Sequence, residues 1–361
     1  MKYLIIPGFL AGIALNLFVA TKISGSEIVA SWTRTVSEIQ KQETSAARMK
    51  SQGPHFVVRK EPLIYLLDTA GNLAGTADHT GYLAEANRAG NYLIKFQKVG
   101  KEIELFDYSG ERFWMVESRE YPYFSFNGKL VLLMNGDHSR IRIFDYNGNN
   151  IGAEAVSGRL CTVIAFSDCT DIGAAGFADG SYVVIGSGGG IIHSGRAPKG
   201  AVVKSIAVSR KGLFVAVHYG ADDRDGLMIA GVVEGDVSHA AFGYHAARAP
   251  LHVSDEGYVM ALDRDRIVLI DRKGDEEYSI PVAPAREGQA SVVSSGDFYA
   301  VAYPGEKGSA ALVIVRRDGT VVFSRQFLNE PYLTAEFRGE CLLARGSENL
   351  YCYSVRSRDP Q

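Results

Sequence analysis

The residue types that could carry out chemistry form one dense cluster in this sequence. The segment "GADDRDG" at 220–226 places three aspartates, Asp222, Asp223 and Asp225, close together. Carboxylate oxygens at this spacing resemble part of a calcium loop, but the glutamate that completes such a loop is not at the required distance. The segment therefore predicts a solvated turn rather than a metal site.

Two other features give no stronger signal for chemistry. The segment "GSGGG" at 186–190 resembles a phosphate cradle, but no Lys-Ser/Thr pair follows it and no helix is expected to begin there, so a hairpin turn is favoured. The eight histidines show no metal-ligand spacing. No G-x-S-x-G segment occurs. We therefore expect no catalytic residue, no cofactor and no metal, and we expect that the protein is not an enzyme.

The four cysteines allow two local pairs. Cys341 and Cys352 flank the turn "RGSEN" in strands expected to be adjacent, which makes them a candidate disulfide. Cys161 and Cys169 lie around another strand and its turn. Two such pairs would fit an oxidising compartment. The alternative is that each cysteine is a small buried apolar residue.

The bulk composition sets limits on fold and partners. The chain has 361 residues, of which 46% are hydrophobic and 22% are charged, as expected of a protein with a packed core. Its formal net charge is −3, so it has no basic field that would concentrate nucleic acid. We expect no nucleic-acid partner.

The chain repeats itself along most of its length. "IELFDYSGER" at 103–112 and "IRIFDYNGNN" at 141–150 each carry an apolar run that leads to a turn glycine. Such a run, a polar turn with glycine and a second run predict a strand, a hairpin turn and another strand. Comparable segments occur at 63–73, 182–192, 227–237, 267–277 and 312–322.

A second series of turns alternates with the first. Seven further turns lead into apolar strands, at 87–96, 126–134, 171–177, 209–217, 254–262, 294–302 and 337–344. Each unit of about 40 residues thus holds four short strands, which resembles the blade of a β-propeller. The Gly-His and Trp-Asp dipeptides of WD40 blades and the tryptophan signature of quinoprotein blades are absent. The "D-x-x-G" turns that begin at Asp68, Asp107, Asp145 and Asp271 are similar to those of quinoprotein blades.

The resemblance to the WD40-like and quinoprotein-like β-propellers, with no specific family indicated, implies an all-β fold over residues 55–361. We expect seven blades, with eight as the alternative, because eight segments look like third strands while seven turns lead into second strands. Residues 55–67, "HFVVRKEPLIYLL", are expected to pair with the C-terminal strands, including "LYCYSV" at 350–355, and so to close the ring.

The first 22 residues are expected to anchor the protein in a membrane. Residues 3–21 carry no charge, and as a helix they would span roughly 28 Å, close to the thickness of the hydrocarbon layer. A cleaved signal peptide is the alternative. A very short N-terminal tail favours a single-pass anchor in the inner (cytoplasmic) membrane, with the propeller on the extracytoplasmic, periplasmic side.

Residues 23–54 are expected to form a helical stalk. Ser24 and Glu27 have the spacing of a capping box, and Gly53-Pro54 ends the segment. Spacings of three and four residues predict a short amphipathic helix with one apolar face. This stripe consists of Val29, Trp32, Val36 and Ile39. It is a candidate docking face for a partner or for a second copy of the chain, and the alternative is a solvated stalk.

Three functions fit these features. The first is a membrane-anchored scaffold for protein–protein interactions, with other membrane or envelope proteins as partners and the bilayer contacted through residues 3–21. The second is a ligand-binding or enzymatic propeller with its site at the central channel. The third, by analogy of fold alone, is an adaptor comparable to the propeller subunit of the outer-membrane β-barrel assembly complex. A polar channel mouth would favour the second function, and an apolar patch on the rim or stalk would favour the first.

Overall fold

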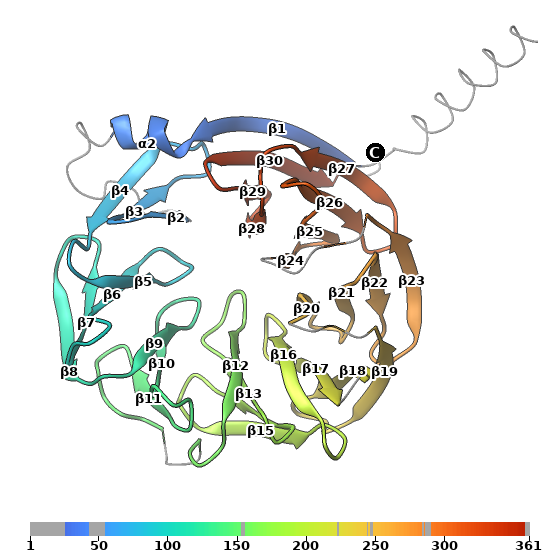
Figure 1. Cartoon of the computed structure of the whole chain (residues 1–361), viewed down its shortest axis with the longest axis horizontal. Helices are drawn as coiled ribbons and strands as arrows, with labels where there is room; N and C mark the ends of the chain where they lie inside the picture. Colours follow the sequence, from blue (N-terminus) through green and yellow to red (C-terminus); the bar gives the residue numbers. More distant parts are fainter. Residues whose placement is uncertain are drawn as a thin grey trace, which may run out of the picture.

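The computed structural model describes residues 26–42, 55–152, 156–221, 224–243, 245, 248–283, 285 and 290–357. These residues form eight small antiparallel sheets arranged around a central axis (Figure 1). The fold is therefore an eight-bladed β-propeller. The predicted all-β propeller is confirmed, the preferred number of seven blades is wrong, and the alternative of eight is correct.

The blades follow one another along the chain, and within most of them the strands run in order from the channel to the rim. Blade 1 holds β2 (Phe56–Lys60), β3 (Leu63–Leu67) and β4 (Leu73–Asp78); blade 2 holds β5 (Leu83–Ala86), β6 (Tyr92–Phe96), β7 (Glu102–Asp107) and β8 (Arg112–Glu117); blade 3 holds β9 (Tyr121–Phe124), β10 (Leu130–Met134) and β11 (Ile141–Asp145); blade 4 holds β12 (Cys161–Phe166), β13 (Gly173–Phe177), β14 (Ser181–Ile185) and β15 (Ile191–Arg196).

The second half of the ring has the same plan. Blade 5 holds β16 (Val202–Val208), β17 (Phe214–Ala221), β18 (Arg224–Gly231) and β19 (Val237–Phe242); blade 6 holds β20 (Leu251–Val253), β21 (Val259–Asp263), β22 (Arg266–Ile270) and β23 (Glu276–Pro281); blade 7 holds β24 (Ser291–Ser295), β25 (Phe298–Pro304), β26 (Ala310–Arg316) and β27 (Val321–Phe327); blade 8 holds β28 (Thr334–Arg338), β29 (Cys341–Arg345), β30 (Asn349–Ser357) and β1 (Ser26–Thr35).

The hydrophobic core is divided into layers between neighbouring blades. Ala174 and Val184 of blade 4, for example, pack in one cluster with Val203 and Val217 of blade 5. The middle strands are covered on both faces, so β10, "LVLLM", is buried at every position. Such continuous apolar runs are typical of strands enclosed between two layers. Each blade is therefore stable only against its neighbours, as in other repeat architectures.

The ring is closed by β1, which is the outermost strand of blade 8. It pairs antiparallel with β30, from Ser26 opposite Ser357 to Thr35 opposite Asn349. Figure 1 shows β1 lying along β30 at the rim. The predicted closure by residues 55–67 is wrong, because β2 pairs with β3, and β3 pairs with β4, in blade 1.

The helical stalk predicted over residues 23–54 is wrong for Ser26–Thr35, which form β1. Only α2 (Val36–Gln42) is helical among the described residues of this region. The apolar spacing that predicted a helix covers only four residues. The open edge of β30 supplies hydrogen-bond partners along a whole strand, and the β-branched and aromatic residues of the segment suit a strand equally well.

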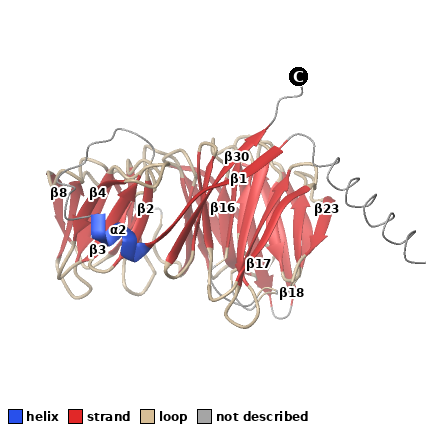
Figure 2. Cartoon of the chain, turned by 90° about the horizontal axis from the view of Figure 1, so that it is seen from above, coloured by secondary structure: helices blue, strands red, loops and turns tan. Residues whose placement is uncertain are grey.

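A capping box does begin the helix, but at another position. The Glu38 backbone N–H donates to Thr35 Oγ1 at 3.2 Å, and the Thr35 N–H donates to the Glu38 carboxylate at 3.0 Å. These reciprocal bonds satisfy backbone groups at the start of α2. Val36 and Ile39 then lie buried against Phe56 of blade 1 and Leu350 of blade 8. Figure 2 shows α2 on the outside of the ring.

Neighbouring blades are also joined by an aromatic contact at the rim. On β8, Trp114 Nε1 donates to the Tyr146 carbonyl of blade 3 at 2.9 Å. Gly148, with φ of 82°, leaves room for the indole ring, since a Cβ there would lie 2.8 Å from Trp114 Cγ. Trp32 on β1 makes the same contact with the Thr69 carbonyl of blade 1, at 3.0 Å, and covers Gly71.

These contacts use the predicted D-x-x-G turns. The Asp145 carboxylate accepts hydrogen bonds from the backbone N–H groups of Asn147 and Asn149, and the turn closes at Gly148. Asp107 and Asp271 organise their turns in the same way. An aspartate at the first position and a glycine with positive φ at the fourth are what such a turn requires. The turn motif identified in the sequence is thus a docking platform between blades.

The predicted membrane anchor at residues 3–21 and the rest of the N-terminal segment before Ser26 lie outside the described residues. Within the described part of the chain, no helix is long and apolar enough to cross a membrane.

Candidate functional site

A cavity of about 840 Å³ follows the central axis of the ring. Its wall is formed by β2 and by the innermost strands of the other seven blades. The middle of the wall is apolar, with Val163, Ile206, Val208 and Val292 among its residues. The charged residues of the wall lie at the two ends of the channel.

The first end, which we call the Arg88 mouth, is crossed by a chain of polar contacts. Arg88 of blade 2 forms an ion pair with Asp168 of blade 4. The second oxygen of Asp168 lies 3.3 Å from His252 Nδ1 of blade 6, and His252 Nε2 lies 2.7 Å from Ser294 Oγ of blade 7. Arg338 of blade 8 donates to the Arg88 carbonyl. Five blades are thus joined across one mouth.

The charges of this network are held in their ionised forms. Burial would raise the pKa of Asp168, but the contacts with His252 and Arg88 outweigh it and place this pKa well below its usual value. For Arg88, burial lowers the pKa, while Asp168 and Glu336 raise it by more. Each carboxylate at this mouth therefore already has a cationic partner within the protein.

Asp168, His252 and Ser294 have the connectivity of a nucleophile, a base and an orienting carboxylate. Ser294 is not among the residues that line the cavity. Asp168 is also paired with Arg88, so its charge is shared between two partners. We interpret the three residues as a link between blades 4, 6 and 7.

The other end of the channel, the Arg345 mouth, is lined by Arg59, Arg248 and Arg345. Arg59 pairs with Glu85 at 2.5 Å, and Arg248 donates to the Thr162 carbonyl at 2.6 Å. The Arg345 side chain has no hydrogen-bond or ion-pair partner among the described residues. Burial is the main cause that lowers the pKa of Arg345. Tyr332 opposes it, and Arg59 and Glu336 have smaller effects, of which that of Arg59 lowers the pKa and that of Glu336 raises it.

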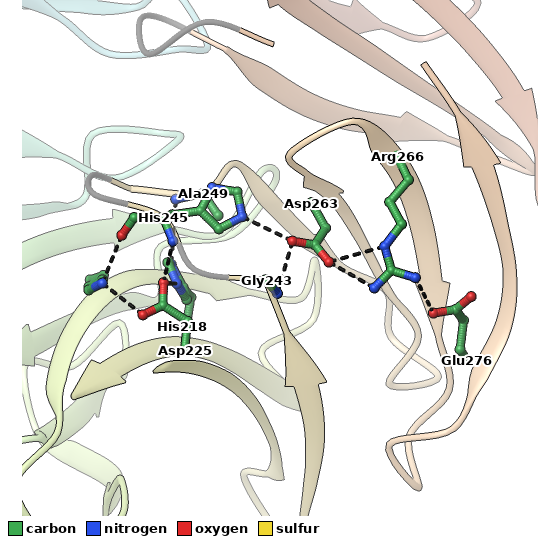
Figure 3. Close-up of polar contacts among 9 residues, drawn as sticks. His218, Asp225, Gly243, His245, Ala249, Asp263, Arg266 and Glu276 are labelled. Carbon is green, nitrogen blue, oxygen red and sulfur yellow. Dashed lines mark hydrogen bonds and ion pairs between the residues drawn. The ribbon is translucent and has the colours of Figure 1, made fainter. Parts of the chain in front are cut away.

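A second polar cluster lies between blades 5 and 6, away from the cavity (Figure 3). Asp225, whose side chain is 0% exposed, is 2.8 Å from Lys204 Nζ and 2.7 Å from His218 Nε2, and it accepts the His245 backbone N–H at 2.9 Å. The His245 ring in turn lies 3.1 Å from Asp263 Oδ1.

This buried ion cluster continues to the rim. Asp263 binds the Arg266 guanidinium at 2.9 Å, and Arg266 reaches Glu276 at 2.9 Å. Burial would raise the pKa of Asp263, but His245 and Arg266 lower it overall. Burial lowers the pKa of His218 to about 4, so this ring is neutral at pH 7 although it contacts a carboxylate. The cluster fixes the crossover from β19 to β20.

The sequence placed Asp225 in a solvated turn, and this expectation is wrong, because the β17–β18 hairpin carries the carboxylate into the space between two blades. Asp222 and Asp223 lie outside the described residues. In the described part of the chain, no group of three or more histidine, cysteine, aspartate or glutamate residues could hold a metal ion. The segment at 186–190 is the hairpin turn expected, closed by a bond from Gly186 N–H to the Gly190 carbonyl.

The predicted docking stripe does not exist as one helical face. Val29 and Trp32 lie on β1, and Val36 and Ile39 lie on α2. Val29 is 47% exposed and Trp32 is half-buried, but Val36 and Ile39 are buried in the core. An interaction through all four residues, including dimerisation of a stalk helix, would need this part of the ring to open.

The four cysteines are free thiols in the structure. Cys341 stands opposite Ser354 and Cys352 stands opposite Leu343, so the two candidate disulfide partners are diagonal neighbours rather than a direct pair. Cys161 and Cys352 are buried, and Cys169 and Cys341 are partly buried.

Comparison with known proteins adds information on the fold. No family model matches the chain, and no curated protein matches it. Among solved structures, the chain is similar to BamB from Moraxella catarrhalis, with 12% sequence identity and a TM-score of 0.63 over 91% of this chain and 100% of that one. The fold is a β-propeller similar to that of BamB. A variant of KlHsv2 with loop 6CD replaced by a Gly-Ser linker is also similar, with 13% identity and a TM-score of 0.54 over 75% of this chain and 92% of that one.

Proposed function

We propose that the protein is a membrane-tethered, extracytoplasmic scaffold that binds other envelope proteins through the rim of its propeller and performs no catalysis itself. The likeness to BamB supports this proposal at the level of architecture alone, since the two chains share a similar fold. The observation that carries the proposal is an apolar patch where blades 2 and 3 meet at the rim.

The patch is a set of exposed apolar side chains along the rim: Phe113 and Met115 on β8, the outermost strand of blade 2, and Tyr146 in the turn after β11 of blade 3. Their exposed fractions are 44%, 48% and 41%. The bond from Trp114, which lies between Phe113 and Met115, to the Tyr146 carbonyl holds the two blades together at this point. Because each side chain is about half exposed, burying the rest of it would contribute roughly half of the 1.5–3 kcal/mol that full burial of a large apolar side chain provides. Exposed apolar side chains that gather on a rigid surface are typical of protein-binding sites.

The tether is proposed on the sequence of residues 3–21. In the structure, β1 begins at the rim of the ring (Figure 1). A membrane anchor that precedes β1 would therefore attach the propeller by its rim near blade 8. Such an attachment would leave the patch on blades 2 and 3 available to a neighbouring protein.

The test is affinity purification of the full-length protein from its own membranes in a mild detergent. Three forms are compared: wild type, the double variant Phe113→Asp/Met115→Asp, and Val99→Asp, which changes a turn residue that is 95% exposed. We expect one envelope protein to co-purify in fixed ratio with wild type and with Val99→Asp, and to be lost from the double variant. Thermal melting of each form controls for folding.

Recovery of the chain alone from wild type would contradict the scaffold function. Retention of the partner by a folded double variant would contradict the location of the binding surface.

A further inference from the structure

We propose that the central cavity binds a small organic anion, whose carboxylate or phosphate group is held at the Arg345 mouth by Arg345. This ligand site is independent of the scaffold function and of the rim patch.

The first argument is the balance of charge in the cavity wall. Four arginines line the cavity, against two acidic residues, Asp168 and Glu336. Both acidic residues are already paired, Asp168 with Arg88 and Glu336 with Arg338. Both pairs involve residues of the Arg88 mouth. Arg59 is paired as well, with Glu85, which lies outside the lining. The lining arginines without an acidic partner are therefore Arg248 and Arg345, both at the Arg345 mouth.

The second argument is the state of Arg345 itself. A partly buried guanidinium without a hydrogen-bond acceptor is costly, and most proteins pair such a group. Arg345, at the end of β29, has no such partner among the described residues, and Arg59, on β2 of the next blade, is near enough to lower its pKa. Arg59 is already paired with Glu85, so Arg345 is the guanidinium that lacks an acceptor. An anion at this mouth would supply the missing acceptor.

The third argument concerns the chemistry of the ligand. The planar fork of an arginine favours oxyanions that accept two parallel hydrogen bonds, as carboxylates and phosphates do. A volume of about 840 Å³ lies within the range of small-molecule sites. The apolar middle of the wall, with Val163, Ile206 and Val292, suits an uncharged apolar body. The ligand expected is therefore an organic acid or phosphate ester with an apolar part.

The test uses the full-length protein in an uncharged detergent and three matched probes of one size, namely benzoate, phenyl phosphate and benzyl alcohol. Isothermal titration calorimetry measures the binding of each probe. We expect saturable binding of one or both anions with a Kd below roughly 1 mM, and at least tenfold weaker binding of benzyl alcohol. The anion with the lower Kd identifies the head group as carboxylate or phosphate.

Arg345→Gln is the decisive variant, and Arg196→Gln, which changes an exposed rim arginine on β15, is its control. We expect Arg345→Gln to weaken anion binding at least tenfold and Arg196→Gln to leave it unchanged. In the absence of probe, the melting temperature of Arg345→Gln should equal or exceed that of wild type, because an unpaired charge is removed. A purely structural arginine would give a lower melting temperature.

Three results would overturn the proposal: no saturable binding of either anion, binding that survives Arg345→Gln, or equal binding of the uncharged probe. None of these results depends on whether a protein partner binds the rim, so failure of this site and failure of the scaffold function are distinguishable.

Discussion

At the scale of single residues, the structure depends on buried charges that are paired across blades. Asp225 and Asp263 each bind one histidine and one cationic side chain, and Asp168 does the same at the Arg88 mouth. Breaking such a buried pair from one side typically costs 3–5 kcal/mol, because the remaining charge loses its partner. These carboxylates therefore specify which blade surfaces face each other.

The histidine in the buried ion cluster predicts a pH dependence of stability. The unfolded chain takes up a proton on His218 near pH 6.5, whereas burial keeps the folded ring neutral until its pKa of about 4. The unfolded state then binds more protons between these values, so stability is complete above pH 6.5 and is lost as the pH falls toward 4. From pH 7.5 to pH 5.0 the expected loss from this group is about 2 kcal/mol.

Urea unfolding at the two pH values measures this loss. His218→Gln should reduce the difference between pH 7.5 and pH 5.0 by about that amount, whereas His138→Asn, a change at an exposed turn, should not alter it. An equal pH dependence in wild type and His218→Gln would contradict the assignment.

At this scale the sequence predicted little of the candidate site. The residues of the Arg88 mouth lie on different blades, far apart in the chain, so no spacing connects them. One signal was present: Arg88 and Asp168 each stand two residues after the end of an innermost strand. An alignment of the repeats on their strands would have placed both residues at the same end of the ring.

At the scale of elements, the contact between an outer-strand aromatic side chain and a glycine turn of the next blade occurs at three places in the ring. The two tryptophans make it with D-x-x-G turns. Tyr278 on β23 makes it with the turn "RRDG" at 316–319, which has arginine at its first position: the Tyr278 hydroxyl donates to the Arg316 carbonyl at 3.3 Å and the ring covers Gly319. The turns were recognisable in the sequence because aspartate and glycine fix their backbone. The aromatic partners were not, because they lie on a different repeat from the turn that they cover.

This contact predicts different costs for two chemically identical substitutions. In Gly148→Ala the new methyl group meets the Trp114 ring, and φ is positive, so we expect a loss of roughly 2–3 kcal/mol in unfolding free energy. In Gly110→Ala φ is also positive, but nothing lies within 4 Å of the new methyl group, so we expect roughly 1 kcal/mol. Chemical denaturation of both variants measures the difference, and equal losses would contradict the docking role of Gly148.

The segment Ser26–Gln42 shows why an element can be misassigned from sequence. Val29, Trp32, Val36 and Ile39 have helical spacing, but the first two belong to a strand whose partner, β30, lies more than 300 residues further along the chain. The hydrogen bonds that β1 forms along the open edge of β30 determine its structure more strongly than a helical pattern of four residues does. Because that edge is created only when the ring forms, local reasoning could not include it.

Truncation tests this assignment. Removal of residues 1–53 takes away β1 and α2, exposes the edge of β30 and uncovers the core around Val36 and Ile39. We expect this form to lose at least about 3 kcal/mol of stability and to aggregate. Removal of residues 1–24 alone should leave the melting temperature of the propeller unchanged. Thermal melting and light scattering distinguish the two forms, and equal stability of both would contradict the structural role of β1.

At the scale of the whole molecule, the period of the turns was sufficient to predict a propeller, and the number of blades was not. In the sequence, eight segments resemble the third strand of a blade, but only seven turns lead into a second strand. The missing second strand is β2, which begins at Phe56. From the sequence alone, this segment is expected to close the ring. Blade 8 obtains its fourth strand from β1, so the last repeat is completed only in the ring, whereas blade 1 has three strands.

Ring closure by β1 is the central claim of this account, and a disulfide trap measures it most directly. Val29 and Ser354 are Cα partners in the β1–β30 ladder, whereas Tyr353, the residue before Ser354, projects to the opposite face of the sheet. Because Cys341 also stands opposite Ser354, both pairs are made in a Cys341→Ser background. The account predicts that Val29→Cys/Ser354→Cys forms an intramolecular disulfide in air, identified by peptide mass spectrometry, and that Val29→Cys/Tyr353→Cys does not. A reduced first pair, or one that links two chains, would contradict a ring closed by its own N-terminal strand.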